Sequence, residues 1–239
     1  MSVILYELVG KDDLRFSPFA WRTRMALAHK GIEAERVPVG FTEKDKIAFS
    51  GQEKVPVLKD GEIVVADSWR IACHLEDRYS ARPSLFGSPE GRGLARLVNH
   101  MADMLHPPMA RLILGDVFAN VEARDQTYFR KTREARFGNT IEAMHAERDN
   151  HKDAFTNALQ PFRLTLKDQP FLSGMTPAYA DYALFGTFMW ARITSPYPLL
   201  ADDDTVFAWR EKMLDLFGGM ARNAPTAKRK CATKPGGTA

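Results

Sequence analysis

A serine followed by a proline stands between a short apolar run and a helical pattern. Ser17 and Pro18 follow the β-branched and aromatic residues of 2–9, which predict a buried strand. Pro18 suits the first turn of a helix, and Gly31 suits the left-handed residue that ends one. Ser17 is therefore predicted at or just before the N-cap. A hydroxyl at the positive end of a helix dipole either caps the helix or donates a hydrogen bond to a bound anion.

A second stretch combines a carboxylate with a helix start. Asp67 and Ser68 precede a helical pattern, and Ser68 is predicted to be its N-cap. A carboxylate beside a helix N-terminus offers partners to an ammonium and a carboxylate that share one carbon. Read alone, the stretch is explained as well by plain helix capping.

These residues fall in a region where strand and helix patterns alternate. Strands are predicted over 2–9 and 33–39, followed by a hairpin over 55–66 and a helix from 68 to about 80. This order predicts a small α/β unit. On the first helix, Arg22 and Arg24 lie on a polar side, which predicts that both are exposed to solvent.

From residue 89 onward the pattern is helical without strand signals. Helices are predicted over about 89–114, 124–148, 152–167, 178–193 and 203–217. The domains are therefore 1–80 and 89–220, joined by a proline-containing linker. Seven residues of the helical part could line an apolar pocket, although such spacing is more typical of a core: Met101, Met104, His106, Met109, Phe118, Phe185 and Trp190.

Composition excludes several classes of protein. The net charge of +3 comes from residues 221–239, a basic tail that is predicted to be disordered. Without the five cations of this tail, the 33 basic residues fall to 28 against 30 acidic ones, which does not favour a nucleic-acid binder. The longest apolar run, 183–191, is shorter than the roughly 20 residues that span a bilayer. No secretory signal is visible, so a cytoplasmic location is expected. Cys73, Cys231 and the six histidines form no disulfide framework and no metal-spaced pair.

Four motifs in a fixed order carry a resemblance to a known family. They are "SPFAWRTRMALAHKG", "EKVPVLKDG", "ADSWRIACHLEDRY" and "GMTPAYADYALFG". The chain resembles the glutathione transferases over nearly its whole length, in particular the serine-type classes. It is most similar to the bacterial β-aryl-etherase-like branch and is also similar to the zeta class, the maleylacetoacetate isomerases. Ala178 departs from the family pattern, which has Ser, Thr or Asn at this helix start, so either Thr176 substitutes or the cap is weak.

The resemblance implies a thioredoxin-like α/β N-terminal domain followed by an all-α C-terminal domain. It implies that Ser17 donates a hydrogen bond to the sulfur of glutathione, the co-substrate. Ser17 stands where redox relatives have a cysteine, and without thiols this loop cannot exchange disulfides. The implied glutathione-binding residues are Lys54 at the glycyl carboxylate, Val55 and the cis-proline Pro56 at the cysteinyl part, and Asp67 and Ser68 at the γ-glutamyl end.

The expected function is attack of an activated glutathione thiolate on a small apolar or aromatic electrophile, with aryl-ether cleavage as one form and detoxification as the general role. The first alternative is a zeta-like isomerase of a small dicarboxylate, which needs cations near the pocket; Arg22 and Arg111 are the candidates. The others are a non-catalytic protein that binds glutathione and apolar ligands, and an interaction module that has lost the site. The family resemblance also implies a homodimer. Composition and residue spacing predict no membrane, metal or specific nucleic-acid partner.

Overall fold

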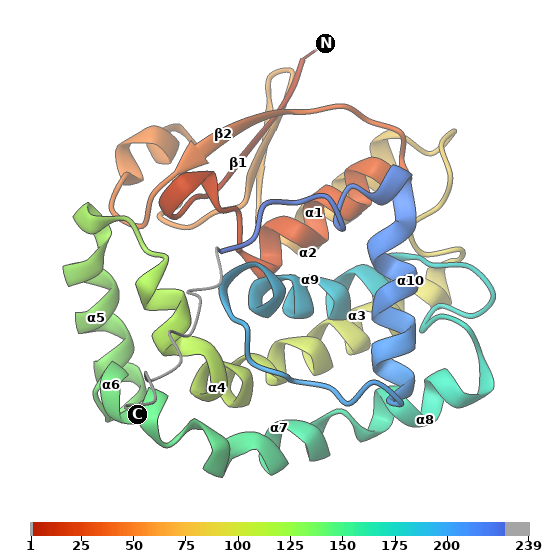
Figure 1. The fold of residues 1–239 in the computed structure, drawn as a ribbon. Coiled ribbons are helices and arrows are strands. Elements are labelled where there is room, and N and C mark those ends of the chain that lie inside the picture. The colour runs from red at the N-terminus through yellow and green to blue at the C-terminus, as the bar shows by residue number, and fades with distance from the viewer. Residues whose placement is uncertain (1, 228–239) are drawn as a thin grey trace, which may run out of the picture.

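The computed structural model describes residues 2–227. A mixed four-stranded sheet with its helices is followed by an all-helical part, so the expected fold class, a thioredoxin-like α/β domain before an all-α domain, is confirmed (Figure 1). The strands are β1 (Val3–Leu8), β2 (Glu35–Val39), β3 (Val57–Asp60) and β4 (Ile63–Ala66). The α-helices of this domain are α1 (Pro18–His29) and α2 (Ser68–Arg78), and its 3-10 helices are η1 (Lys11–Asp13) and η2 (Lys44–Ser50).

The sheet has the order β2-β1-β3-β4. The central strand β1 runs parallel to β2 and antiparallel to β3, which forms the hairpin with β4 around Gly61. Alternate side chains of β1 are buried, as expected for a strand whose two faces differ. Helices α1 and α2 lie along the sheet and separate it from the helical domain (Figure 1).

Both ends of α1 follow from local sequence. Ser17 is the N-cap and Pro18 the first helical residue, and Gly31 adopts a φ of +62° just after the helix. Trp21 and Met25 are buried in the core. The helix therefore begins and ends where the sequence predicts.

The helical domain holds more helices than the sequence predicted. They are α3 (Pro89–Met104), α4 (His106–Ala119), α5 (Ala123–Phe137), α6 (Ile141–Ala146), η3 (Arg148–His151), α7 (Lys152–Ala158), α8 (Gln160–Asp168), α9 (Tyr179–Thr194) and α10 (Thr205–Gly219). The continuous helices expected over 89–114, 124–148 and 152–167 are wrong, since each is divided.

Backbone chemistry explains these divisions. Pro107 and Pro108 have no N–H to donate, and α3 ends just before them at Met104. Gly138 has a φ of +68° and ends α5. Pro161 lies in the first turn of α8 and separates it from α7 in the same way.

The central helix α9 is buried along nearly its whole length and packs against α1 and α3. Its N-cap residue is Ala178, whose methyl group cannot accept a hydrogen bond. The start of the helix is held instead by Asp181, whose carboxylate accepts hydrogen bonds from the backbone N–H of Leu172, Ser173 and Ala178 and from the indole N–H of Trp209. A buried carboxylate with four donors compensates for the missing cap.

The packed body extends beyond the boundary expected at residue 220. Ala221 is fully buried, and the backbone N–H of Ala227 donates to the carbonyl of Ile193 at 2.8 Å. Residues 221–227 therefore do not share the disorder expected of the tail. The remainder of that tail, 228–239, lies outside the described residues.

Candidate active site

Ser17 lies at the start of α1, where its hydroxyl oxygen already accepts a hydrogen bond and its hydroxyl proton is available to donate one. Its side chain is 4% exposed, and its Oγ accepts a hydrogen bond from the backbone N–H of Ala20 at 3.3 Å. A hydroxyl that accepts in this way still has its proton to donate. The capping role and the anion-binding role considered for Ser17 are thus compatible.

Ser17 opens onto a cavity of about 540 Å³ between the two domains. Lys54 and Val55, also singled out from the sequence, line the same cavity. Most of the remaining wall is apolar and includes Phe16, Phe19, Phe41, Phe129, Phe137 and Trp190. Three of the expected site residues thus share a mostly apolar space of the size that holds a small ligand.

The turn before β3 joins this cavity to the start of α2. The Val55–Pro56 bond is cis, as the sequence resemblance implied. Val55 precedes the strand, whose pairing with β1 starts at Val57. The carbonyl of Pro56 accepts a hydrogen bond from the backbone N–H of Asp67 at 3.3 Å. The cavity is not lined by Pro56, Asp67 or Ser68. This bond nevertheless places the start of α2 next to the turn whose Lys54 and Val55 do line it.

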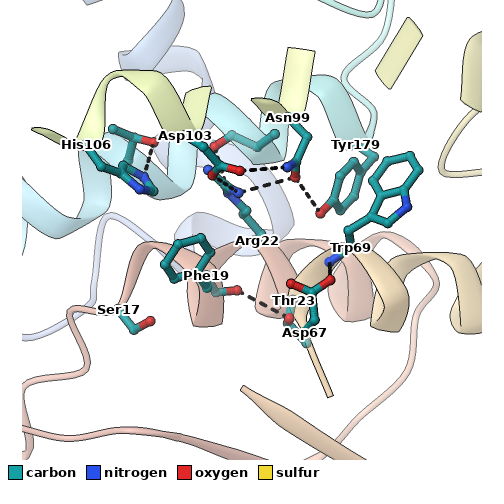
Figure 2. Close-up of polar contacts among 12 residues, drawn as sticks. Ser17, Phe19, Arg22, Thr23, Asp67, Trp69, Asn99, Asp103, His106 and Tyr179 are labelled. Atoms are coloured by element: carbon teal, nitrogen blue, oxygen red, sulfur yellow. Dashed lines mark hydrogen bonds and ion pairs between the residues drawn. The ribbon is translucent and has the colours of Figure 1, made fainter. Parts of the chain in front are cut away.

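Asp67, and not Ser68, is the N-cap of α2, so the expected cap position is wrong by one residue. Asp67 Oδ1 accepts a hydrogen bond from the backbone N–H of Trp69 at 3.1 Å (Figure 2). It also accepts one from the backbone N–H of Arg70 at 3.1 Å. Asp67 has a φ of +80°, a conformation that costs a non-glycine residue on the order of 1–3 kcal/mol. Ser68 is buried beside the hydroxyl of Tyr179. Exposed Asp67 therefore presents a carboxylate at a helix N-terminus from a strained backbone.

The expectation that Arg22 and Arg24 are solvent-exposed is wrong. Arg22 reaches from α1 to α3, where its Nη1 lies 2.7 Å from Asp103 and donates to Asn99 at 3.2 Å (Figure 2). Arg24 is 8% exposed and lies over the Trp21 ring. Helix α1 packs against α2 and α9, so its polar residues are enclosed by neighbours that a single helical pattern does not reveal.

The apolar wall of the cavity differs from the sequence expectation. Of the seven residues proposed for it, only His106 and Trp190 line the cavity; Met109 and Phe185 belong to the core, and Met104 is 75% exposed. Helix α5 supplies much of the wall that sequence reasoning missed, through Phe129, Arg133, Arg136 and Phe137. Their helical spacing shows that they share one side of α5, but it does not show that this side contacts the cavity.

Another wall of the cavity is a loop of the first domain held by a residue of the second. Buried Asp125 on α5 accepts hydrogen bonds from the backbone N–H groups of Phe41 and Thr42, each at 2.9 Å, and from the Thr42 hydroxyl at 2.6 Å. A Cβ at Gly40 would lie 2.6 Å from Asp125 Oδ2. The close approach therefore requires glycine there, and the clamp fixes where Phe41 enters the cavity.

His106 is neutral at ordinary pH. Burial, together with the charges of Arg22 and Arg136, lowers its pKa to about 3. Its Nε2 lies 3.1 Å from the Thr187 hydroxyl, and its ring packs edge-on against Phe19 and Trp190. At neutral pH the cavity therefore holds an uncharged imidazole, in which one ring nitrogen is an N–H donor and the other an acceptor.

Within residues 2–227 no group of acidic, histidine or cysteine side chains is arranged to hold a metal ion. No described helix is long and apolar enough to cross a membrane.

Comparison with known proteins identifies the family. Profiles of the glutathione S-transferase N-terminal and C-terminal domains match residues 16–78 and 94–199, which together make up more than half of the chain. The chain belongs to the glutathione S-transferase family. A glutathione S-transferase of Ceriporiopsis subvermispora, solved in complex with glutathione, has the same fold with a TM-score of 0.77 and 22% identity, over 91% of this chain and 96% of that one.

Curated relatives match this transferase chain over different lengths. Glutathione S-transferase Z1 of Arabidopsis thaliana is 35% identical over 74 residues, 29% of this chain and 34% of that protein. Maleylacetoacetate isomerase of Rattus norvegicus is 30% identical over 92 residues, 36% of this chain and 43% of that protein. Glutathione S-transferase 4 of Zea mays is 25% identical over 192 residues, 77% of each. The chain thus spans about a third of the Arabidopsis relative. The family is established, but these relatives do not place the chain in the β-aryl-etherase-like branch.

Proposed function

We propose that this chain is a glutathione transferase in which Ser17 stabilises the thiolate of bound glutathione. The observation that carries the proposal is the Ser17 hydroxyl itself, which lines an apolar cavity at the N-terminus of α1 and keeps its proton free to donate. A helix N-terminus and a hydroxyl donor both favour an anion, and thiols in such places titrate in the range of roughly 3.5–7.5 instead of ~8.5. Glutathione bound there is a nucleophile at neutral pH.

The rest of glutathione fits the residues around Ser17. Lys54 is exposed at the cavity wall and suits the glycyl carboxylate. The backbone of Val55, next to cis Pro56, suits the cysteinyl part, because an extended peptide can add beside β3. Asp67 and the N-terminus of α2, where Ser68 lies, suit the γ-glutamyl ammonium and carboxylate.

The reaction proposed is displacement at an activated carbon. The thiolate sulfur attacks, a carbon–sulfur bond forms, and a leaving group such as halide or aryloxide departs with the bonding electrons. The apolar wall orients an aromatic ring beside the sulfur and excludes water. Cleavage of an aryl ether, the function expected from the etherase-like resemblance, is the case in which aryloxide leaves.

Isomerisation of a small dicarboxylate is the second candidate, and the similarity to maleylacetoacetate isomerase favours it. Neither cation proposed for it from the sequence lines the cavity: Arg22 is paired with Asp103, and Arg111 lies over the Phe137 ring. A protein that binds glutathione without turnover is the third candidate.

The chain is also proposed to act in the cytoplasm as a homodimer that pairs the α/β domain of one copy with the helical domain of the other. Leu94, Leu97 and Met104 form an exposed apolar face on α3, and Ile63 and Val64 are exposed on the edge strand β4. Apolar faces on both domains support this pairing.

Two measurements test the proposed activity. The ultraviolet absorbance of the thiolate, followed against pH, should give bound glutathione a pKa below that of the free thiol. A panel of chlorodinitrobenzene, a β-aryl ether and maleylacetoacetate should show conjugation of an aromatic compound. Rapid turnover of maleylacetoacetate alone would favour the isomerase, and binding of glutathione with no turnover of any compound would favour the binding protein.

A further inference from the structure

Two arginines of α5, Arg133 and Arg136, line the cavity. Phe129, Arg133, Arg136 and Phe137 succeed one another at helical spacing, and all four line the cavity. The Arg133 guanidinium lies 4.7 Å from the centre of the Phe129 ring and 5.3 Å from that of Phe41. Arg136 lies 5.6 Å from the centre of the Phe137 ring. The same wall therefore presents aromatic faces and two positive charges.

The carboxylates that line the cavity already have cationic partners. Glu53 lies 2.8 Å from Lys44, and Asp103 lies 2.7 Å from Arg22. Their charges are therefore balanced without the arginines of α5. The cavity carries an excess of positive charge even when Lys54 is assigned to the glycyl carboxylate of glutathione.

Within residues 2–227, neither Arg133 nor Arg136 forms an ion pair with a carboxylate. Glu134, which lies between them in sequence, pairs instead with Arg130 at 2.8 Å. The Nη1 of Arg133 donates to the Thr132 hydroxyl at 2.7 Å. Arg133 is half-buried, and burial lowers its pKa, because the charged form has lost water without gaining an anion. A guanidinium in this state gains most from a ligand that supplies the anion.

We propose that the acceptor substrate is an aromatic electrophile that carries a carboxylate or a sulfonate, and that Arg133 and Arg136 bind this anionic group. The inference rests on the proposed transferase function and names its substrate class. The aromatic ring packs among Phe41, Phe129 and Phe137, while the anion meets the planar donors of the guanidinium groups. The electrophilic carbon is then presented toward the glutathione sulfur at Ser17.

Kinetics with a matched pair of electrophiles test this specificity. Chlorodinitrobenzoate and its carboxamide have almost the same shape and the same leaving group, but only the first is charged. After correction for the uncatalysed rates, the unmodified enzyme should prefer the carboxylate in kcat/KM by about ten- to hundredfold. Arg133→Gln and Arg136→Gln should each reduce this preference by about tenfold, with most of the change in KM.

A control variant separates local binding from long-range attraction. Lys131→Gln removes the same charge from an exposed position of α5 that does not line the cavity, and it should leave the preference unchanged. Arg133→Lys keeps the positive charge and should retain part of the preference for the carboxylate. This variant distinguishes loss of the charge from loss of packing at residue 133. An equal loss of preference in Lys131→Gln would overturn the proposed contact.

Binding of unreactive analogues keeps this test independent of turnover. Calorimetric titration with dinitrobenzoate and dinitrobenzamide, which have no halide to lose, should show tighter binding of the carboxylate by the unmodified chain and a preference about tenfold smaller in Arg136→Gln. If no electrophile is turned over but this preference is present, the proposed catalysis fails and the anion site stands. Equal affinity for the two analogues overturns the anion site even in an active enzyme. Tighter binding of an aliphatic dicarboxylate such as maleate overturns the aromatic part of the inference.

Discussion

The Ser17 hydroxyl oxygen lies 3.3 Å from the Ala20 backbone nitrogen and accepts its hydrogen bond, which leaves the hydroxyl proton available to donate. Ser17→Ala removes both the cap and the proposed donor to the thiolate. We expect turnover to fall by roughly 10²–10³, the loss associated with one oxyanion donor, while glutathione affinity stays within a few-fold. The thiolate absorbance of bound glutathione, measured against pH, should show a raised pKa in the variant.

Two control variants separate these roles. Ser88→Ala removes an equivalent N-cap from α3, where Ser88 accepts from the Gly91 N–H at 3.1 Å, and it should cost about 1 kcal/mol of stability with normal turnover. Ser17→Thr keeps a hydroxyl and should retain much of the activity. An unchanged glutathione pKa in Ser17→Ala would refute the donor role.

Asp67→Ala and Ser68→Ala should each weaken glutathione binding by about 1–3 kcal/mol, because a charge-assisted partner or a buried hydroxyl at the start of α2 is lost. Calorimetric titration measures this effect. Asp67→Asn is the informative comparison, since asparagine caps a helix as well as aspartate but has no charge for an ammonium. Wild-type affinity in Asp67→Asn would reduce Asp67 to a helix cap.

His106 should make stability depend on pH in a defined direction. Its pKa in the folded chain is about 3, whereas an unfolded histidine titrates near 6.5, so stability is lost as the pH falls below about 6.5. Between pH 6.5 and 5, His106→Gln should lose about 2 kcal/mol less than the unmodified chain. Urea unfolding at several pH values measures this difference. His29, whose pKa is also lowered by burial, is present in both chains and cancels. The exposed His100→Gln is the control, and equal pH slopes in the two variants would contradict the prediction.

The pair of Arg22 and Asp103 should stabilise the contact between the domains. Asp103→Asn leaves the buried Arg22 guanidinium without its anion and should cost about 3 kcal/mol. Asp77→Asn breaks the exposed pair with Arg92 and should cost less than about 1 kcal/mol. Both values are measured by denaturant unfolding. Similar losses in the two variants would mean that the Arg22 pair is no stronger than one at the surface.

Light scattering at micromolar concentration should show a dimer of the unmodified chain. Leu97→Glu places a charge on the exposed apolar face of α3 and should shift the protein to monomer. Leu164→Glu makes the same change at an equally exposed position of α8 and should leave the dimer intact. A mass near 26.9 kDa for the unmodified chain would contradict the dimer.

Features encoded within a few residues could be predicted from the sequence. Ser17 and Gly31 mark the ends of α1 through capping and a left-handed backbone, which need no distant partner. The order of strands and helices in the first domain follows from hydrophobic periodicity. The position of Ser17 between β1 and α1 was singled out from this order, and Ser17 lines the cavity. The cap of α2 was misplaced because Asp67 and Ser68 are both good capping residues, and the choice depends on backbone angles.

Features that depend on two distant segments could not be predicted in the same way. Arg22 looks like a surface residue until Asp103, far along the chain, provides its partner. The apolar wall was assigned to methionines and aromatic residues of α3, α4 and α9, whereas Phe129 and Arg133 of α5 supply much of it. The sequence shows whether one side of a helix is apolar or charged, but only the packed structure shows which element or cavity that side contacts.

The Asp125 carboxylate that fixes Phe41 and Thr42 makes the shape of one domain depend on a side chain of the other. A loop of the first domain takes its shape from a side chain of the second, and this loop borders the space for the acceptor. If the helical domain were exchanged for that of another transferase, Ser17 would stay, but the mouth of the cavity would be remodelled with the new domain. Under the proposed function, the substrate range would then change by recombination at the linker, without any change to the domain that carries Ser17.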